Sequence, residues 1–427
     1  DRIAFVGNSI TCGGHYHSYI WLYYMTRFPD QRIDIFNEGV GGDVAEMIYQ
    51  RLDKVFEHEP TVVTLSFGMN DVGYMDFRKP GADTIARNRV EKACRDYALI
   101  EYPEVRKILI GSSPYDETSR FNKVAFPGKN TQILKIVDFL NARARENQWG
   151  FVDFNRPMVA INQWEQAADS MYTLCGKDRI HPSTDGHLVM AYLFLKAQGL
   201  AGKLVADIRI DGAGKKVTRS DNCRVSDLSV SSDNLTFTYE AKSLPYPIDT
   251  SYYDNEKHTQ ADALSVIPFM DEMNYEGLSV SGLSDGYYGL TIGGEFIGRF
   301  TARELERGIN MALLQNTPQY KQAMKIRQMN EERWLKERKM REFYWVEYNL
   351  MRKTGMLWAC NEAAVDTLRK YRPHDIFLQW NGDLWLQYMH KGIREDCVNE
   401  QQDLVNQIYE QNKPIPLRIE IKKFTDL

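Results

Sequence analysis

A serine, an aspartate and a histidine occur in this sequence at positions that acyl transfer through a covalent intermediate could use. Ser9 follows the short apolar run of residues 3–6, and Asp178 precedes His181 by three residues. A serine hydroxyl is a weak nucleophile at neutral pH, so an imidazole has to accept its proton, and a carboxylate usually fixes the tautomer of that imidazole. We therefore predict that Ser9 is the nucleophile, that His181 is the general base and then the acid, and that Asp178 orients His181.

Hydrogen-bond donors for the tetrahedral intermediate are also present. The segment at 37–43 is rich in glycine, and the segment at 68–71 reads Gly-Met-Asn-Asp. Charge develops on the carbonyl oxygen during acyl transfer, and preorganised N–H groups stabilise it. We predict an oxyanion hole formed by the backbone amides of Ser9 and Gly42 and by the side-chain amide of Asn70. A nucleotide-binding loop is the weaker interpretation, because the glycine run lacks the G-x-G-x-x-G spacing and follows the second expected strand.

The strands and helices that must position these residues alternate regularly along the sequence. From residue 1 to about 203, short apolar runs alternate with amphipathic stretches, which is typical of a parallel sheet covered by helices on both faces. The pattern predicts strands at 2–6, 32–36, 61–67, 107–110 and 151–154, and helices at 15–27, 43–56, 83–101, 129–147 and 184–198. It indicates a flavodoxin-like strand order, 2-1-3-4-5, with the functional site where strands 1 and 3 diverge.

Four segments resemble the four blocks of the SGNH (GDSL-like) hydrolase superfamily. The residues that would define these blocks are Ser9, Gly42, Asn70 and His181. The resemblance covers roughly residues 1–200, and the step from His181 to Pro182 before a capped helix is typical of the last block. It implies a three-layer α/β serine esterase that needs no cofactor and no metal. Asn8 stands where many relatives carry aspartate, so we expect altered local hydrogen bonding with retained catalysis.

We predict three parts along the chain: the hydrolase domain at 1–203, an accessory β-sandwich at 204–300, and a helical C-terminal region at 301–427. In the second part the apolar residues alternate with a period of two, with glycine, serine and asparagine between the runs. In the third part Thr317-Pro318 predicts the start of a helix that runs to about Arg352. Such a helix would be roughly 50 Å long, and we expect it to pack across the first domain.

Two histidines and two aspartates near these motifs have less specific interpretations. His15 and His17 lie close to Ser9 in the sequence, but no acidic partner occurs at the spacing of a helical metal site. We therefore expect them to form a pocket wall or a helix surface. For Asp43 and Asp71 we expect structural roles, such as capping a helix.

The substrate is indicated only by analogy. A β-sandwich joined to such a hydrolase resembles the layout of bacterial carbohydrate esterases, so we expect an acetylated oligosaccharide or polysaccharide as substrate. One alternative is a short-chain acyl esterase or thioesterase acting on a non-sugar ester. Another is a glycan-binding protein in which the hydrolase serves as a scaffold. Trp380 and Trp385 could stack on sugar faces, although such tryptophans more often belong to a core or a domain interface.

Composition excludes several other classes. The chain of 427 residues has 53 basic and 58 acidic side chains and a net charge of −5, and no basic cluster alternates with aromatic residues, so we expect no nucleic-acid partner. No apolar run has the length of a membrane span.

The six cysteines form no C-x-x-C pair, which suggests neither a zinc site nor a disulfide framework. The sequence begins almost on its first strand, so we expect a removed signal peptide and an extracytoplasmic location. The oligomeric state stays open.

Overall fold

The structure is a computed structural model that describes residues 1–98, 105–251 and 258–424. Its first part is built on a parallel sheet of β1 (Arg2–Gly7), β2 (Asp34–Gly39), β3 (Val62–Phe67), β4 (Arg106–Gly111) and β5 (Gly150–Asp153). The strand order is β2-β1-β3-β4-β5, which confirms the predicted flavodoxin-like fold. The loops that follow β1, β2 and β3 therefore lie along one edge of the sheet.

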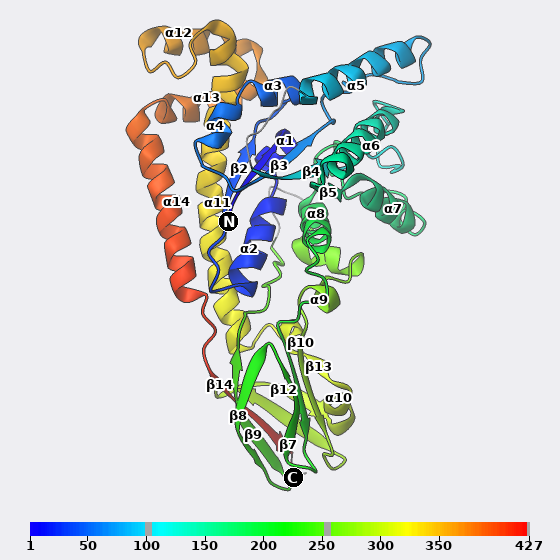
Figure 1. The fold of residues 1–427 in the computed structure, drawn as a ribbon, viewed down its shortest axis with the longest axis vertical. Helices are drawn as coiled ribbons and strands as arrows, with labels where there is room; N and C mark the ends of the chain where they lie inside the picture. The colour runs from blue at the N-terminus through cyan, green and yellow to red at the C-terminus, as the bar shows by residue number, and fades with distance from the viewer. Residues whose placement is uncertain (99–104, 252–257, 425–427) are drawn as a thin grey trace.

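Helices cover this sheet (Figure 1). They are α1 (Ser9–Gly13), α2 (Tyr16–Arg27), α3 (Ala45–Tyr49), α4 (Leu52–Phe56), α5 (Ala82–Ala98), α6 (Lys129–Asn147), α7 (Asn155–Glu165) and α8 (Thr184–Ala197). Every residue of α2 is buried, because the helix lies against β2, α8 and the long C-terminal helix α11 (Pro318–Val346).

Two helices differ from the predicted pattern. The stretch expected as one helix over 43–56 contains two, α3 and α4, which are separated at Arg51. The backbone of Arg51 has a φ of −128°, and its buried guanidinium donates hydrogen bonds to a carboxyl oxygen of Asp43 at 2.7 Å and to the carbonyl of Glu38 at 2.8 Å. These bonds hold the turn against the end of β2. The pattern also missed α7. Residues 99–101 of the helix expected over 83–101 lie outside the described part of the chain.

Two further sheets form the sandwich. Their strands are β6 (Ala206–Asp211), β7 (Lys216–Asp221), β8 (Cys223–Val230), β9 (Asn234–Ala241), β10 (Glu276–Ser281), β11 (Tyr287–Ile292), β12 (Glu295–Thr301), β13 (Ile309–Asn310) and β14 (Leu417–Lys423). One sheet has the order β13-β10-β6-β7 and the other β12-β11-β14-β9-β8. β14 pairs with both β9 and β11, so the end of the chain completes the second sheet.

The elements cross the expected limits between the three parts. β13 and β14 lie beyond residue 300 in the sequence, yet they belong to the sandwich. Between β9 and β10, the 3₁₀ helix η1 (Gln260–Ser265) and the short helix α9 (Phe269–Glu272) contribute side chains to the core of the first sheet. Apolar side chains from this segment are buried there because α8 packs against η1.

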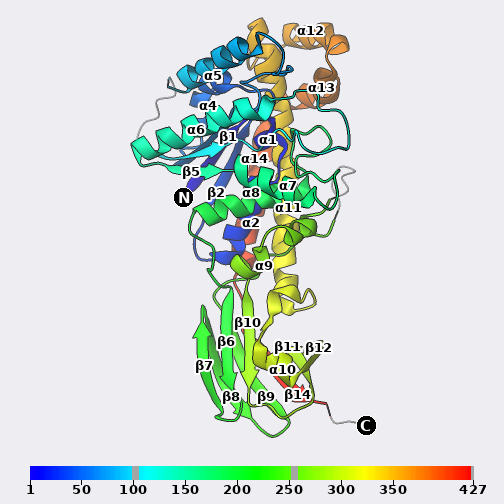
Figure 2. The same cartoon turned by 90° about the vertical axis from the view of Figure 1, so that its right-hand side faces the viewer.

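The remaining C-terminal elements are helical. They are α10 (Ala302–Arg307), η2 (Met311–Leu313), α11, the π-turn η3 (Glu347–Met351), η4 (Arg352–Thr354), α12 (Glu362–Tyr371), η5 (Arg372–His374), α13 (Ile376–Tyr388) and α14 (Lys391–Gln411). The side chain of Thr317 caps α11 by accepting the N–H of Tyr320, which confirms the predicted helix start. Figures 1 and 2 show α11 running from the sandwich past the sheet to α12, with α14 beside it. Among the described residues, no helix combines the length and the apolar character that crossing a membrane requires.

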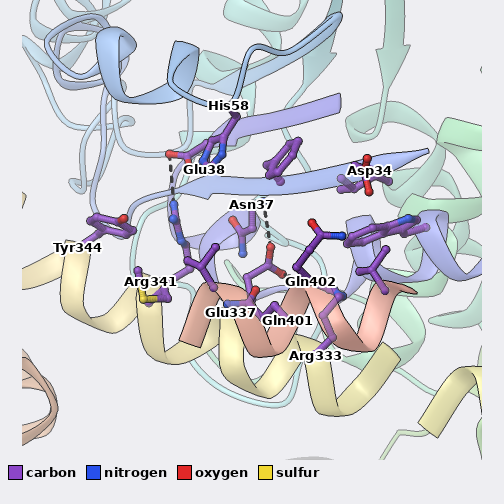
Figure 3. Close-up of a pocket in the computed structure, with 16 residues that line it drawn as sticks. Asp34, Asn37, Glu38, His58, Arg333, Glu337, Arg341, Tyr344, Gln401 and Gln402 are labelled. Carbon is purple, nitrogen blue, oxygen red and sulfur yellow. Dashed lines mark hydrogen bonds and ion pairs between the residues drawn. The ribbon is translucent and has the colours of Figure 1, made fainter. Parts of the chain in front are cut away.

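Buried charges join α11 to the edge strand β2. The backbone N–H of Asn37 donates to Glu337 Oε1 at 3.1 Å, and Glu38 lies 3.2 Å from Arg341. Figure 3 shows these side chains around a small cavity of about 130 Å³ that β2, α11 and α14 enclose. Burial alone would raise the pKa of Glu38, but Arg341, His58 and Arg51 lower it to about 2. The contact thus depends on a carboxylate that stays charged.

We expect Glu38→Ala to lower the free energy of unfolding by about 3–5 kcal/mol, because Arg341 and Arg51 lose a buried partner. The control is Glu395→Ala, which removes an exposed pair with Lys391 on α14 and should cost at most about 0.5 kcal/mol. Urea unfolding measures the stability of both variants.

Because the pKa of Glu38 is lowered to about 2, the contribution of Glu38 to the free energy of unfolding is present above about pH 4.5 and is lost as the pH falls toward 2. Equal stability of the two variants at pH 7 would contradict this account.

Candidate active site

Ser9 lies at the point where β1 gives way to α1. Asn8 is the N-cap of α1, and its side-chain oxygen accepts the backbone N–H of Ile10 at 3.0 Å. Ser9 is the first residue of that helix and is half-buried. N–H groups in the first turn of a helix have no partner within the helix. This capping bond is one that aspartate also makes, so at this contact the structure does not show the altered hydrogen bonding expected for Asn8.

The structure brings the three predicted triad residues together. Nε2 of His181 lies 2.8 Å from Oγ of Ser9, and Nδ1 of His181 lies 2.5 Å from Oδ2 of Asp178. The other oxygen of Asp178 accepts the backbone N–H groups of Ile180 and His181, each at 2.9 Å. Burial alone would raise the pKa of Asp178, but its contacts with His181 and with these backbone groups lower it. The carboxylate is therefore held in its charged form against the imidazole.

The two other predicted donors lie on the loops after β2 and β3. Gly42 has a φ of +86°, a conformation that favours glycine, and a Cβ there would meet no other atom. Glycine is thus needed at this position for its backbone angle and not for space. Nδ2 of Asn70 donates to the carbonyl of Asp43 at 3.0 Å, which leaves its second N–H for another acceptor.

Tyr74 was missed by the sequence reasoning. Its hydroxyl donates to Oδ1 of Asn70 at 2.5 Å, so the amide of Asn70 is held with its NH₂ group on the other side. The ammonium of Lys129 lies 3.7 Å from the centre of the Tyr74 ring and donates to the carbonyls of Met69 and Gly73 at 2.6 and 2.8 Å. The sequence contained one signal that could have predicted this contact: Tyr74 lies only four residues after Asn70.

Two carboxylates, of which Asp43 is fully buried, support the same loops. Asp71 accepts the backbone N–H groups of Ala45 and Gly68, both at 2.8 Å, and burial raises its pKa to about 6. It thereby joins the start of α3 to the end of β3. Asp43 binds Arg51. The structural roles that we expected for both aspartates agree with these contacts.

Ser9 and His181 open into a cavity of about 340 Å³. The residues that line it are Ser9, Ile10, Gly13, Gly14, His15, His181, Pro182, Thr184, His187, Trp334 and Arg338. Its wall therefore includes two side chains of α11. The ring of His15 stacks on Trp334 at 3.8 Å, and His15 lines the pocket, which is the first of the two positions expected for it. His17 is fully buried and does not line the cavity, so the expectation of a pocket wall or a helix surface is wrong for this residue; burial lowers its pKa to about 4.

No sequence signal pointed to the residues of α11 at this site. Four residues lie on one side of α11 and of the turn that follows it, because successive members are four, seven and four positions apart. They are Trp334, Arg338, Trp345 and Asn349. A Cβ on Gly41 would lie 2.9 Å from Cδ1 of Trp345, and Nδ2 of Asn349 donates to the Gly41 carbonyl at 3.3 Å. Among the residues that the structure describes, no group of three or more histidine, cysteine, aspartate or glutamate side chains has the arrangement of a metal site.

The two tryptophans considered for sugar stacking have different environments. Trp385 is buried, and its Nε1 donates to Glu347 at 2.7 Å, so it belongs to the core of the helical region. Trp380 is 66% exposed.

Gly39 allows α1 to approach β2. A Cβ at this position would lie 2.2 Å from the backbone nitrogen of Cys12. We expect Gly39→Ala to lower the free energy of unfolding by about 3 kcal/mol, since the backbone of α1 would have to move. The control is Gly13→Ala on α1, where a Cβ meets nothing within 4 Å and where alanine favours the helix. Chemical denaturation of both variants tests this, and an equal effect on stability would contradict it.

The chain is similar to known proteins over nearly its whole length. The family model described as "GDSL-like Lipase/Acylhydrolase family" matches residues 5–189, and the one described as "Diltiazem deacetylase C-terminal helical domain" matches residues 324–413. A solved structure of a gut microbial diltiazem-metabolizing enzyme is 42% identical and covers 99% of this chain and 98% of its own, with a TM-score of 0.96. An acetylxylan esterase from Geobacillus stearothermophilus is 24% identical over 219 residues, which are 47% of this chain and 94% of the relative. The chain is therefore an ester hydrolase that belongs to the GDSL-like lipase/acylhydrolase (SGNH) family and carries an additional C-terminal helical domain.

Proposed function

We propose that this hydrolase removes acetyl groups from esters through an acyl-enzyme on Ser9. The observation that carries the proposal is the continuous hydrogen-bonded line from Ser9 through His181 to Asp178, with contacts of 2.8 and 2.5 Å. Oγ of Ser9 attacks the carbonyl carbon while its proton passes to Nε2 of His181. His181 then gives this proton to the leaving alcohol oxygen as the ester bond breaks.

The second half of the reaction repeats these steps with water. His181 accepts a proton from a water molecule, whose oxygen attacks the acetyl carbon, and the proton then returns to Oγ of Ser9 as acetate leaves. In both halves the negative oxygen lies among three donors, which are the backbone N–H groups of Ser9 and Gly42 and the free N–H of Asn70. Asp178 stabilises the charged imidazole and fixes its tautomer.

The alcohol part of the ester has two candidate classes. A carbohydrate is supported by the acetylxylan esterase, which matches 47% of this chain, and a polymeric glycan substrate would place the reaction outside the cytoplasm. A non-sugar alcohol is supported by the diltiazem-metabolizing relative, which matches 99% of the chain. We favour a non-sugar alcohol. Trp334 and Arg338 of α11 line the pocket, and α11 lies in the part of the chain that the diltiazem-metabolizing relative matches. The match to the acetylxylan esterase covers under half of the chain.

Acetate release by the wild type and by Ser9→Ala tests the proposal. The substrates are 4-nitrophenyl acetate, diltiazem and acetylated xylo-oligosaccharides, and the control is Ser232→Ala in an exposed loop of the sandwich. We expect Ser9→Ala to lower kcat by about 10⁴-fold or more, while Ser232→Ala keeps full activity. Release from diltiazem but not from the oligosaccharides would select the non-sugar class. Equal rates for the wild type and Ser9→Ala would refute the mechanism.

The oxyanion-hole assignment gives a second test. We expect Asn70→Ala to lower kcat by about 10²–10³-fold. Tyr74→Phe should lower kcat by about 3- to 10-fold with little change in KM, because the amide of Asn70 loses the bond that fixes its orientation. Tyr371→Phe on the surface of α12 is the control. Steady-state kinetics on 4-nitrophenyl acetate measure these effects, and an unchanged kcat in Asn70→Ala would exclude its role.

A further inference from the structure

A chain of three aromatic side chains begins beside Ser9 and leads away from it. It consists of Trp345 at the end of α11 and of Phe377 and Trp380 on α13, and we refer to it as the aromatic ledge. The ring centres of Trp345 and Phe377 are 5.4 Å apart, and those of Phe377 and Trp380 are also 5.4 Å apart. We propose that the aromatic ledge binds an apolar ring of the alcohol part of the ester. This inference rests on the proposed function.

Gly41 connects the ledge to the nucleophile. A Cβ on Gly41 would lie 2.9 Å from Trp345 and 3.9 Å from Cβ of Ser9, so only the missing side chain of a glycine separates the indole from the serine. The bond from Asn349 to the Gly41 carbonyl holds the end of the helical domain at this place. The inner end of the ledge thus lies near Ser9, across the backbone of Gly41.

The outer end of the ledge is open to solvent. Phe377 is 49% and Trp380 is 66% exposed, although large aromatic side chains are usually buried to a greater extent. The Asp375 side chain caps α13 by accepting the N–H groups of Phe377 and Leu378, so the helix that carries both rings begins at a defined residue. The planes of Trp345 and Phe377 meet at 38° and those of Phe377 and Trp380 at 84°, so the ledge offers both ring faces and ring edges, which are the two geometries in which aromatic groups pack.

The neighbouring polar groups favour an apolar ring over a sugar. Asp383, which lies three residues after Trp380, is bound by both terminal nitrogens of Arg372 at 2.6 and 2.7 Å. Glu347 accepts the N–H groups of Trp358 and Trp385. These charged groups already have partners, whereas a sugar requires hydrogen-bond partners for its hydroxyl groups when they leave water.

The size of the acetyl group decides which part of the ester reaches the ledge. Beyond its carbonyl carbon the acetyl group has a single methyl, which cannot extend from Ser9 along three aromatic rings. Only the alcohol part is long enough. The ledge therefore selects among alcohols and takes no part in the bond-breaking steps.

The test compares acetate release from 2-naphthylmethyl acetate and from ethyl acetate by the wild type, Phe377→Ala and Trp380→Ala. We expect each variant to lower kcat/KM for 2-naphthylmethyl acetate by about 3- to 10-fold, mostly through KM, and to leave the value for ethyl acetate unchanged. Trp380→Phe should recover part of the loss. The matched control is Trp164→Ala on α7, where the side chain is 80% exposed and where both substrates should react as with the wild type.

Calorimetric binding of 2-naphthylmethanol provides a measurement that does not depend on turnover. We expect its dissociation constant to rise by a similar factor in Trp380→Ala. Unchanged binding and kinetics in both ledge variants would overturn the inference, as would equal losses for the two esters or losses confined to acetylated xylo-oligosaccharides. Activity that persists in Ser9→Ala would instead refute the proposed function, whatever the ledge variants do.

Discussion

The outer edge of β2 is the constraint on which the arrangement of the molecule depends. An edge strand presents backbone N–H and C=O groups that need partners when another element covers them. Glu337 of α11 accepts one such group from Asn37, and Glu38 and Arg341 form an ion pair across the same contact. Removing these charges from water is costly unless each meets its partner. The charges therefore allow only one position of α11 along the strand.

That position also decides the shape of the candidate catalytic pocket. When α11 is held against β2, Trp334 and Arg338 line the cavity that contains Ser9, and Trp345 reaches Gly41. The C-terminal helical domain therefore forms part of the wall of the candidate active site. The stacking of His15 on Trp334 joins the two parts in the wall of the cavity that contains Ser9.

A second set of buried charged groups holds the loops on the other side of Ser9. Asp71 binds backbone N–H groups from the loops after β2 and β3, and Lys129 binds two carbonyls on either side of Asn70 in the sequence. Burial raises the pKa of Asp71 to about 6 and lowers that of Lys129 to about 7. These groups support the amide of Asn70 through the backbone, and Tyr74 supports it through its side chain.

The sequence by itself determined the hydrolase fold, and it was sufficient to predict the five candidate site residues that the structure brings to one place, because each prediction depends on local information. Ser9, Gly42 and Asn70 follow successive parallel strands, whose carboxyl ends share one edge, and Asp178 lies three residues from His181. Only the tertiary structure decided the pocket wall and the pairing of β14 with β9 and β11. The face of α11 that meets β2 carries charged side chains where an apolar stripe would have marked it. Its contact is recognisable only once β2 supplies the opposite charges and the backbone N–H, which come from the other end of the chain.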